Sequence, residues 1–451
     1  MKKLLQDAAD RAIAYRATID QRSVAPAKDA VEQVEKFRES LPEEGNSEES
    51  TLAMLDELGS PAAIGMTSPR FFGFVIGGSM PVTLAANWIA GAWDQNTVMH
   101  DVAPAVSTLE QVSIEWMLEM LNLPRESGAS FVTGATVANF TALSAARNTV
   151  LQRAGWNCRQ DGLIGAPDLQ VIVSEEAHPT LLKSLGLAGI GENRVTRVAV
   201  DEQGRMRVDT LPEITGPSIV CTQVGNINTG AFDPVGEICD AVAGNNVWVH
   251  VDGAFGLWAA ACPNLQHMTA GMEKADSWAT DGHKWLNVPY DCGLAFVRDE
   301  EALRAAMAIS AAYLPVFSGQ RQPSDYTPEL SRRARGVEVW AALRTLGRNG
   351  LINMVEGCCA RAKQFGEELS AAGFEILNDV VLNQVLVSFG TPEQTLEIIG
   401  RIQDDGTCWC GRTVWQGKTA MRISVSNWAT SEDDVRASVA AITRIANEVL
   451  G

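Results

Sequence analysis

One lysine, Lys284, lies in the stretch TDGHKWLNVPYDCG, just before the apolar residues LAFV. Lysine is rarely buried, and burial lowers the pKa of its ammonium group so that the free amine becomes a nucleophile. Asp252 ends the apolar run VWVHVD, where a carboxylate is unfavourable unless it meets a cation or hydrogen-bond donors. We therefore expect Lys284 to form an imine with an aldehyde cofactor and Asp252 to serve the same site. The alternatives are a buried structural lysine and a structural ion pair at Asp252.

Polar or small residues follow three other β-rich runs. The turn TGAT, with Gly134, Ala135 and Thr136, opens a helix whose free N–H groups could hold a phosphate. His178 ends the run VIVSEEAH, and Asn226 ends the run SIVCTQVGN. In open α/β sheets, ligands bind beyond the carboxyl ends of the strands, so these residues are expected to meet there. Taken singly, each is also typical of an ordinary helix-opening turn or a solvated polar loop.

Together these residues form the set that pyridoxal 5'-phosphate requires. The aldehyde of this cofactor needs a lysine, its pyridine nitrogen needs a carboxylate that keeps it protonated, and its phosphate needs N–H donors. Lys284, Asp252 and the TGAT turn supply these groups, and the imidazole of His178 can lie over the ring. The sequence therefore predicts pyridoxal 5'-phosphate as the cofactor.

The elements that must position these residues indicate an α/β protein. From about residue 130 to 300, short β-rich runs that are apolar throughout alternate with helical patterns. Such runs predict a mostly parallel sheet that is covered on both faces.

The chain divides into three segments with different predicted patterns of helices and strands. Residues 1–60 are predicted to form an N-terminal helical arm, interrupted by the polar stretch LPEEGNSEES. Residues 61–345 are predicted to form the large cofactor-binding domain. Residues 346–451 are predicted to form a small α/β domain with a long helix, the strands NQVLVSFG and TAMRISVSN, and a final helix. That helix opens with a capping-box pattern, Ser431 followed by Asp434.

Composition excludes several classes of partner. The 36 basic and 55 acidic residues give a net charge of −19, which would repel nucleic acid or an anionic membrane surface. No stretch approaches the roughly 20 apolar residues of a spanning helix, and the first 20 residues indicate an amphipathic helix rather than a signal peptide. The nine cysteines are scattered, which favours reduced thiols and matches no zinc spacing. We expect a cytoplasmic protein with a small-molecule substrate and no metal.

At these motifs the chain resembles the group II pyridoxal-phosphate-dependent amino acid decarboxylases, which include the aromatic L-amino acid, tyrosine, glutamate and histidine enzymes. The resemblance runs from SPRFFGF to SNWATSEDDV and is most specific in HVDGAFG, ADSWATDGHKWLNVPYDCG and AAYLPV. It implies the aspartate aminotransferase-like fold, fold type I, with a seven-stranded type of sheet in the large domain. It also implies a homodimer with active sites at the subunit boundary.

The resemblance assigns roles to individual residues. By it, Lys284 is the Schiff-base lysine, Asp252 is the partner of the pyridine nitrogen, and His178 is the stacking residue. The expected cofactor contacts besides these are Gly134, Ala135, Thr136, Asn226, Ala254 and His283. The chain departs from the family pattern at Asp281 and Gly282, where many relatives have Asn-Pro, and at TGATVAN, where relatives often have a serine-rich turn.

Two residues favour decarboxylation among the reactions that this cofactor supports. The bond that breaks is the one held perpendicular to the ring, and the decarboxylases of the family place a histidine over that ring, as His178 would be. Tyr313 lies in AAYLPVFSGQRQPSDYTPELSRR, a segment typical of a mobile lid. In the family, a tyrosine at the matching position donates the proton that completes the amine, whereas relatives with phenylalanine there tend to make aldehydes. The alternative is that Tyr313 only anchors the lid.

Arg422, in TAMRISVSN, lies where relatives present an arginine to the substrate carboxylate. The alternative is an ion pair between Arg422 and Asp433 or Asp434. The segment RFFGFV, which contains Phe74, is apolar and aromatic, and this composition favours a substrate with an aromatic or uncharged side chain.

Three hypotheses remain open. The first is decarboxylation of an L-amino acid to the amine and carbon dioxide, leaning to aromatic or uncharged side chains. The second keeps the cofactor and changes the reaction to that of an acidic amino acid decarboxylase, a carbon–carbon lyase or an aminotransferase. The third is a non-enzymatic relative that kept the fold for protein binding. The presence of Lys284, Asp252 and His178 together argues against the third.

Overall fold

A computed structural model describes residues 1–309 and 319–451, so Tyr313 lies outside the described residues. The chain forms two compact units that do not follow the order of the sequence. Unit 1 consists of residues 1–76, 361–377 and 385–451, and unit 2 of residues 77–360 and 378–384. The division into an arm, a large domain and a small domain stays a prediction.

Unit 2 is built on a seven-stranded sheet with the strand order β1-β7-β6-β5-β4-β2-β3. Its strands are β1 Gly128–Val132, β2 Gln170–Ser174, β3 Val195–Val198, β4 Ser218–Gln223, β5 Val247–Asp252, β6 Ser277–Asp281 and β7 Gly293–Val297. Strand β7 is antiparallel to both of its neighbours, β1 and β6, and the other pairs are parallel. All strands except β7 therefore point the same way, and their carboxyl ends lie at one edge. This sheet confirms the predicted mostly parallel α/β architecture.

Most strands of this sheet are buried on both faces. Every residue of β1, β4, β6 and β7 is buried, and Trp248 and Trp278 lie fully inside. A strand that is buried on both faces has no solvent side that would favour alternating polar residues.

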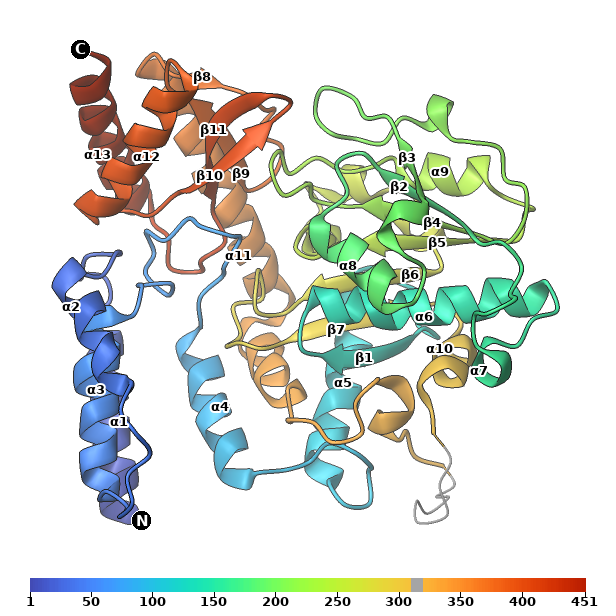
Figure 1. Cartoon of the computed structure of the whole chain (residues 1–451), viewed down its shortest axis with the longest axis horizontal. Coiled ribbons are helices and arrows are strands. Elements are labelled where there is room, and N and C mark those ends of the chain that lie inside the picture. Colours follow the sequence, from blue (N-terminus) through green and yellow to red (C-terminus); the bar gives the residue numbers. More distant parts are fainter. Residues whose placement is uncertain (310–318) are drawn as a thin grey trace. The chain divides into compact units, whose positions relative to one another are not determined.

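Helix α6 carries small residues that let it pack closely on the sheet. The helices of unit 2 up to residue 309 are α4 Pro81–Trp93, α5 Pro104–Met120, α6 Ala135–Arg153, α7 Cys158–Asp161, α8 Pro179–Leu187, α9 Val235–Ala241 and α10 Glu300–Met307. Helix α6 contacts β1, β5, β6 and β7, and Figure 1 shows it in teal beside these strands. Its buried side includes Ala138, Ala142 and Ala146. The packing brings the first turn of α6 to the sheet edge where the strands end.

Unit 1 combines helices from both ends of the chain with a small four-stranded sheet. The helices are α1 Lys2–Ala17, α2 Lys28–Gln33, α3 Glu48–Ala62, α12 Pro392–Asp405 and α13 Glu432–Leu450, and the sheet has the order β10-β11-β9-β8. Its strands are β8 Glu375–Ile376, β9 Gln384–Ser388, β10 Gly411–Trp415 and β11 Lys418–Ser424. Helix α11, Gly336–Ala371, contains residues of both units and is kinked at Gly347, whose φ is 58°.

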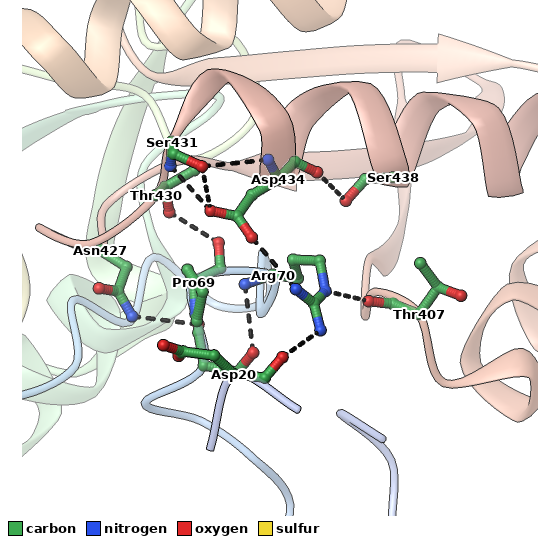
Figure 2. A network of polar contacts seen from close by, with 10 residues as sticks. Asp20, Pro69, Arg70, Thr407, Asn427, Thr430, Ser431, Asp434 and Ser438 are labelled. Carbon is green, nitrogen blue, oxygen red and sulfur yellow. Dashed lines mark hydrogen bonds and ion pairs between the residues drawn. The ribbon is translucent and has the colours of Figure 1, made fainter. Parts of the chain in front are cut away.

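Arg70 links distant segments within unit 1, as Figure 2 shows. Its Nε donates to the carbonyl of Thr407 at 2.8 Å, and its Nη2 donates to the carbonyl of Asp20 at 2.8 Å. Its Nη1 pairs with Asp434 Oδ1 at 3.1 Å. Asp434 also completes the capping box with Ser431 at the start of α13, which confirms the predicted helix start.

None of the helices within residues 1–309 and 319–451 is long and apolar enough to cross a membrane. In the same part of the chain, no group of three or more His, Cys, Asp or Glu side chains could hold a metal ion. All nine cysteines lie among the described residues, and none of them forms a disulfide.

Candidate active site

The register of three strands brings two chain segments together at the sheet edge. Val132 of β1 and Asp281 of β6 both pair with Gly293 of β7. A Cβ atom at Gly293 would lie 2.4 Å from the Cα atom of Gly134, so only glycine allows the turn before α6 to come this close. As a result, the amino terminus of α6 reaches the end of β6.

Asp281 connects the lysine to this helix terminus. Its Oδ2 lies 3.1 Å from Lys284 Nζ, and its Oδ1 accepts a hydrogen bond from the N–H of Ala135 at 2.6 Å. The side chain of Asp281 is 3% exposed, and that of Lys284 is 17% exposed. The half-buried ammonium is therefore neutralised by a buried carboxylate three residues earlier, which is itself stabilised by the positive end of α6.

His283 is held as a neutral hydrogen-bond donor beside Asp281. Its Nδ1 accepts from the N–H of Cys292 at 3.1 Å, so the proton of the neutral ring is on Nε2, which lies 3.6 Å from Asp281 Oδ1. The ring of Tyr290 packs on the imidazole, with centroids 4.2 Å apart. Burial lowers the pKa of His283, and the nearby Asp281 charge opposes this shift.

Asp252 is a buried carboxylate at the end of β5, with only 3% of the residue exposed. Its Oδ2 accepts from Asn139 Nδ2 at 3.1 Å, and its Oδ1 accepts from the N–H of Ala254 at 3.2 Å. Burial raises the pKa of Asp252, while the Lys284 charge and these two donors oppose the shift. The ionisation of Asp252 thus depends on its hydrogen-bond donors.

Asn226, after β4, offers a buried donor. Its Oδ1 accepts from the N–H groups of Asn228 at 2.8 Å and Thr229 at 3.2 Å, which fixes the orientation of the amide. Its Nδ2 is buried and has no hydrogen-bond partner among the described residues. An unsatisfied buried donor is unfavourable by about 1–3 kcal/mol, so this amide is suited to an oxygen atom of a ligand.

His178 is fixed by the helix that it begins. It is the N-cap residue of α8, and its Nδ1 lies 2.6 Å from Thr180 Oγ1 and 3.3 Å from the N–H of Thr180. The ring is half-buried. The imidazole is therefore held in one orientation by the first turn of α8.

The residues present fit pyridoxal 5'-phosphate. Lys284 offers the amine, Asp252 the acid, His178 the imidazole plane and Asn226 an open donor. The N–H of Ala135 is taken by Asp281, but the next N–H groups of α6 have no acceptor within the helix. The unsatisfied Nδ2 of Asn226 is the observation in the structure that a bound ligand would explain.

Nine of the predicted site residues come together in unit 2. They follow the ends of β1, β2, β4, β5 and β6, which point to the same edge. These residues are Gly134, Ala135, Thr136, His178, Asn226, Asp252, Ala254, His283 and Lys284. Arg422 and Phe74 belong to unit 1, and the predicted roles of all of these residues stay predictions.

Arg422 is a half-buried cation in β11. Among the residues that the structure describes, it forms no ion pair, and its Nε is buried without a hydrogen-bond partner. Burial lowers its pKa to about 10. The alternative pairing with Asp433 or Asp434 is not observed, because Asp433 pairs with Arg436 and Asp434 pairs with Arg70.

Phe74 presents an exposed aromatic ring on a constrained backbone. The residue is 59% exposed, and its ring stacks on Trp409 with centroids 5.4 Å apart. Phe71 also stacks on Trp409, at 5.1 Å. Phe74 and the next residue, Val75, have φ values of 55° and 57°. The left-handed conformation is rare for a β-branched residue and is often found at functional sites.

Two contacts in the site were not predicted from the sequence. In the sequence, Asp281 stands out as a departure from the family pattern, and an acid three residues before a lysine at a strand end is a usable signal of an ion pair. Asn139 gives no comparable signal, because one asparagine within a helix of small residues does not show what it faces.

Comparison with known proteins relates this fold and site to one family. The family described as "Pyridoxal-dependent decarboxylase conserved domain" matches residues 32–390. Tryptophan decarboxylase 1 of Oryza sativa subsp. japonica is 28% identical over 88% of this chain and 84% of that protein. The aromatic-L-amino-acid decarboxylase of Bacillus atrophaeus is 25% identical over 100% of this chain and 96% of that protein.

Solved structures show the same fold. The structure of Oryza sativa TDC with PLP and tryptamine has a TM-score of 0.92 at 25% identity and covers 100% of this chain and 98% of that chain. Mouse CSAD has a TM-score of 0.91 at 22% identity over 98% of both chains, and at this identity the likeness concerns the fold alone. The predicted fold type I is thereby confirmed.

Proposed function

Because this chain belongs to the pyridoxal-dependent decarboxylase family, we propose that it converts an aromatic L-amino acid to the corresponding amine and carbon dioxide. The reaction class, decarboxylation of an amino acid with pyridoxal 5'-phosphate (PLP), follows from the family and its relatives. One observation carries the proposal: the ammonium group of Lys284 lies 3.1 Å from the buried carboxylate of Asp281. Both residues lie at the edge of the sheet where strand β5 ends with Asp252.

The side chains at this edge have separate tasks in the proposed reaction. When bound, PLP supplies a ring that accepts the electron pair of the broken bond. Lys284 would hold the aldehyde carbon of PLP, Asp252 would keep the pyridine nitrogen protonated, and His178 would supply the imidazole plane that stacks on the ring. The proposed contacts to the rest of the cofactor are Gly134, Ala135, Thr136, Asn226, Ala254 and His283.

Two residues of unit 1 are proposed to select the substrate. Arg422 binds the carboxylate that will be lost. This role is supported by its half-buried guanidinium group, which forms no ion pair with any described residue and has a buried Nε without a hydrogen-bond partner. Phe74 contacts the aromatic side chain, and its exposed ring stacked on Trp409 supports this role. The tryptophan and aromatic amino acid substrates named for the relatives support the same substrate class.

We further propose that the enzyme is a homodimer in the cytoplasm. Helix α4 exposes Trp88, Ile89 and Trp93, which are 41%, 51% and 46% accessible. Three large apolar side chains on one short helix are unusual on a free surface and suit contact with a second subunit. The absence of disulfides among the nine cysteines, all of which are described, supports a reducing location.

The proposed substrate class is tested by product analysis. The purified protein is incubated with PLP and a panel of L-amino acids, including tryptophan, tyrosine, phenylalanine and glutamate, and amine and carbon dioxide are measured together. We expect equal amounts of both products from an aromatic amino acid. Preferential turnover of glutamate would make this an acidic amino acid decarboxylase, and a keto acid product would make it an aminotransferase.

Lys284→Ala tests the covalent role of the lysine. We expect the variant to stay folded and to lose turnover, because no other described lysine lies beside Asp281 at the sheet edge. Borohydride reduction of the wild-type enzyme should attach PLP to the peptide that contains Lys284. Lys274→Ala is the matched control, because Lys274 is 44% exposed and pairs with Asp240 at the surface. Attachment of the cofactor to another lysine would contradict the assignment.

A further inference from the structure

A continuous chain of buried hydrogen bonds ends at Asp252. Trp248 Nε1 donates to Ser277 Oγ at 2.8 Å, and Ser277 Oγ lies 2.8 Å from His250 Nδ1. His250 Nε2 lies 2.9 Å from Asn139 Oδ1, and Asn139 Nδ2 donates to Asp252 Oδ2 at 3.1 Å. Each of these five residues is at most 3% exposed, so water does not compete for the bonds.

The chemistry of each group sets the direction of every proton in this chain. The indole N–H of Trp248 can only donate, so Ser277 Oγ accepts from it and is free to donate its own proton to His250 Nδ1. The proton of the neutral imidazole is then on Nε2, which donates to the carbonyl oxygen of Asn139. The amide N–H₂ of Asn139 is thereby turned toward Asp252 and donates to its Oδ2, and an ionised carboxylate accepts this bond more strongly than a neutral carboxyl group.

The reversed arrangement is less favourable. If Asp252 were protonated and donated to Asn139, the amide would turn round and His250 would have to carry its proton on Nδ1. Ser277 would then accept from both Trp248 and His250, and its own proton would lose the acceptor that His250 provides in the observed arrangement. A lost buried hydrogen bond is unfavourable by about 1 kcal/mol or more, so Trp248 and Ser277 favour the ionised form of Asp252.

We propose that Asn139, His250 and Ser277 are positioning residues that hold the Asp252 carboxylate ionised and fixed in orientation, so that it keeps the pyridine nitrogen of the cofactor protonated. This inference rests on the proposed role of Asp252 as the partner of that nitrogen. Burial also lowers the pKa of His250 to about 3, so the imidazole stays neutral and keeps one tautomer at neutral pH.

Two variants of His250 separate the positioning role from simple packing. His250→Gln places an amide N–H where Nε2 lies and keeps the donor to Asn139. His250→Phe fills the space and removes the donor. Thr222→Val is the matched control, because the Thr222 hydroxyl donates to the backbone carbonyl of His250 at 3.1 Å and is buried in the neighbouring strand, but has no part in the side-chain relay.

Two measurements on each purified variant give the readout. One is the dissociation constant for PLP added to the cofactor-free protein, and the other is the ¹⁵N chemical shift of the ring nitrogen of bound, labelled PLP, which reports its protonation. We expect His250→Phe to raise the dissociation constant by about tenfold and to move the shift toward that of an unprotonated nitrogen. His250→Gln should stay within about threefold of wild type, and Thr222→Val should match wild type.

The outcomes distinguish this inference from the role on which it rests. If Asp252→Asn changes neither measurement, the proposed role of Asp252 fails. If Asp252→Asn changes both while His250→Phe behaves like Thr222→Val, only the positioning role is overturned. Should His250→Phe not fold, Ser277→Ala is measured instead, and we expect a smaller change in the same direction. An unchanged nitrogen shift in Ser277→Ala would then refute the relay.

Discussion

Tyr313 is proposed to end the reaction by donating a proton. After carbon dioxide leaves, the electron pair at the former α-carbon must be protonated, or oxygen captures it. Tyr313→Phe keeps the ring and removes only the proton donor. We expect carbon dioxide release to continue while the product shifts from amine toward aldehyde, with consumption of oxygen and formation of ammonia and hydrogen peroxide. Amine and aldehyde assays together with an oxygen electrode measure this shift.

The control for that experiment is another tyrosine. Tyr326 is 5% exposed, and its hydroxyl donates to Glu300 Oε1 at 2.5 Å. Tyr326→Phe should therefore lower stability without changing the ratio of amine to aldehyde. A wild-type amine yield in Tyr313→Phe would mean that a different group donates the proton.

His250 makes the stability of the wild-type protein depend on pH. In the unfolded chain its pKa is about 6.5, whereas in the folded protein burial lowers the pKa to about 3. Between pH 6.5 and pH 3, the unfolded state therefore binds one more proton than the folded state. The contribution of neutral His250 to stability is complete above pH 6.5 and is lost as the pH falls toward 3. Between pH 7 and pH 5 this loss amounts to about 2 kcal/mol.

We expect His250→Gln to lack this loss. The unfolding free energy of wild type minus that of His250→Gln should fall by about 2 kcal/mol from pH 7 to pH 5. Urea unfolding of both proteins at the two pH values measures the difference. Comparing the two proteins cancels the titration of other buried acids such as Asp233, whose pKa burial raises to about 6. An equal difference at both pH values would contradict the buried, neutral state of His250.

At the scale of single residues, the sequence predicted the site where a rare residue type interrupts an apolar run. Lys284 and Asp252 stand out in this way. The contacts that hold the two carboxylates do not stand out, because the bonds of Ala135 to Asp281 and of Asn139 to Asp252 join residues 146 and 113 positions apart. Only the strand register brings such residues together.

At the scale of elements, helix α5 contains a buried charge that fixes the segment after residue 318. Glu110 has a fully buried side chain and pairs with Arg321 at 3.0 Å and with Arg332 at 2.8 Å. Burial alone would raise the pKa of Glu110, but the two guanidinium groups lower it overall. Glu110→Gln would leave buried Arg332 without its counter-charge and should destabilise the protein by about 3–5 kcal/mol.

Thermal and urea unfolding measure this effect, and Glu115→Gln is the control on the same helix. Glu115 is exposed, so its substitution should change stability by no more than about 0.5 kcal/mol. Equal effects of the two substitutions would show that the Glu110 pairs contribute nothing net.

Most elements were predicted from their patterns, and the exceptions have a physical explanation. The apolar runs of β2, β4, β5 and β7 gave correct assignments. Strand β6 was not predicted, because SWATD has one large apolar residue. It is nevertheless fully buried, because the sheet provides partners for its polar groups, such as Trp248 for Ser277. Strand β8 has only two residues and is too short to show a pattern.

At the scale of the whole molecule, Arg70 joins segments from both ends of the chain in unit 1 (Figure 2). Arg70→Met keeps much of the side-chain volume but removes two hydrogen bonds to backbone carbonyl groups and the ion pair with Asp434. We expect a destabilisation of about 2–3 kcal/mol and faster amide hydrogen exchange near Asp20, Thr407 and Asp434. Arg38→Met is the control, because the Arg38 side chain is 79% exposed in its pair with Glu35. Unchanged exchange in Arg70→Met would contradict the linking role.

Sequence patterns could not predict that unit 1 combines segments from both ends of the chain. Patterns report neighbours along the chain, whereas the N–H of Phe72 donates to the carbonyl of Trp409 and the N–H of Ser424 donates to the carbonyl of Phe72. The sequence therefore predicted helices at the amino terminus without predicting what covers them.

This construction has a consequence for synthesis on the ribosome. Residues 1–76 leave the exit tunnel first, but their partners in unit 1 lie at 361–377 and 385–451. At typical elongation rates, the side chains of Val24, Phe71 and Phe72, which are buried in the folded protein, remain without these partners for on the order of tens of seconds. Unit 2 can be nearly complete in the meantime. The nascent amino-terminal segment is therefore a substrate for chaperones throughout most of translation, and a ribosome that stalls before residue 361 releases a chain with that segment uncovered.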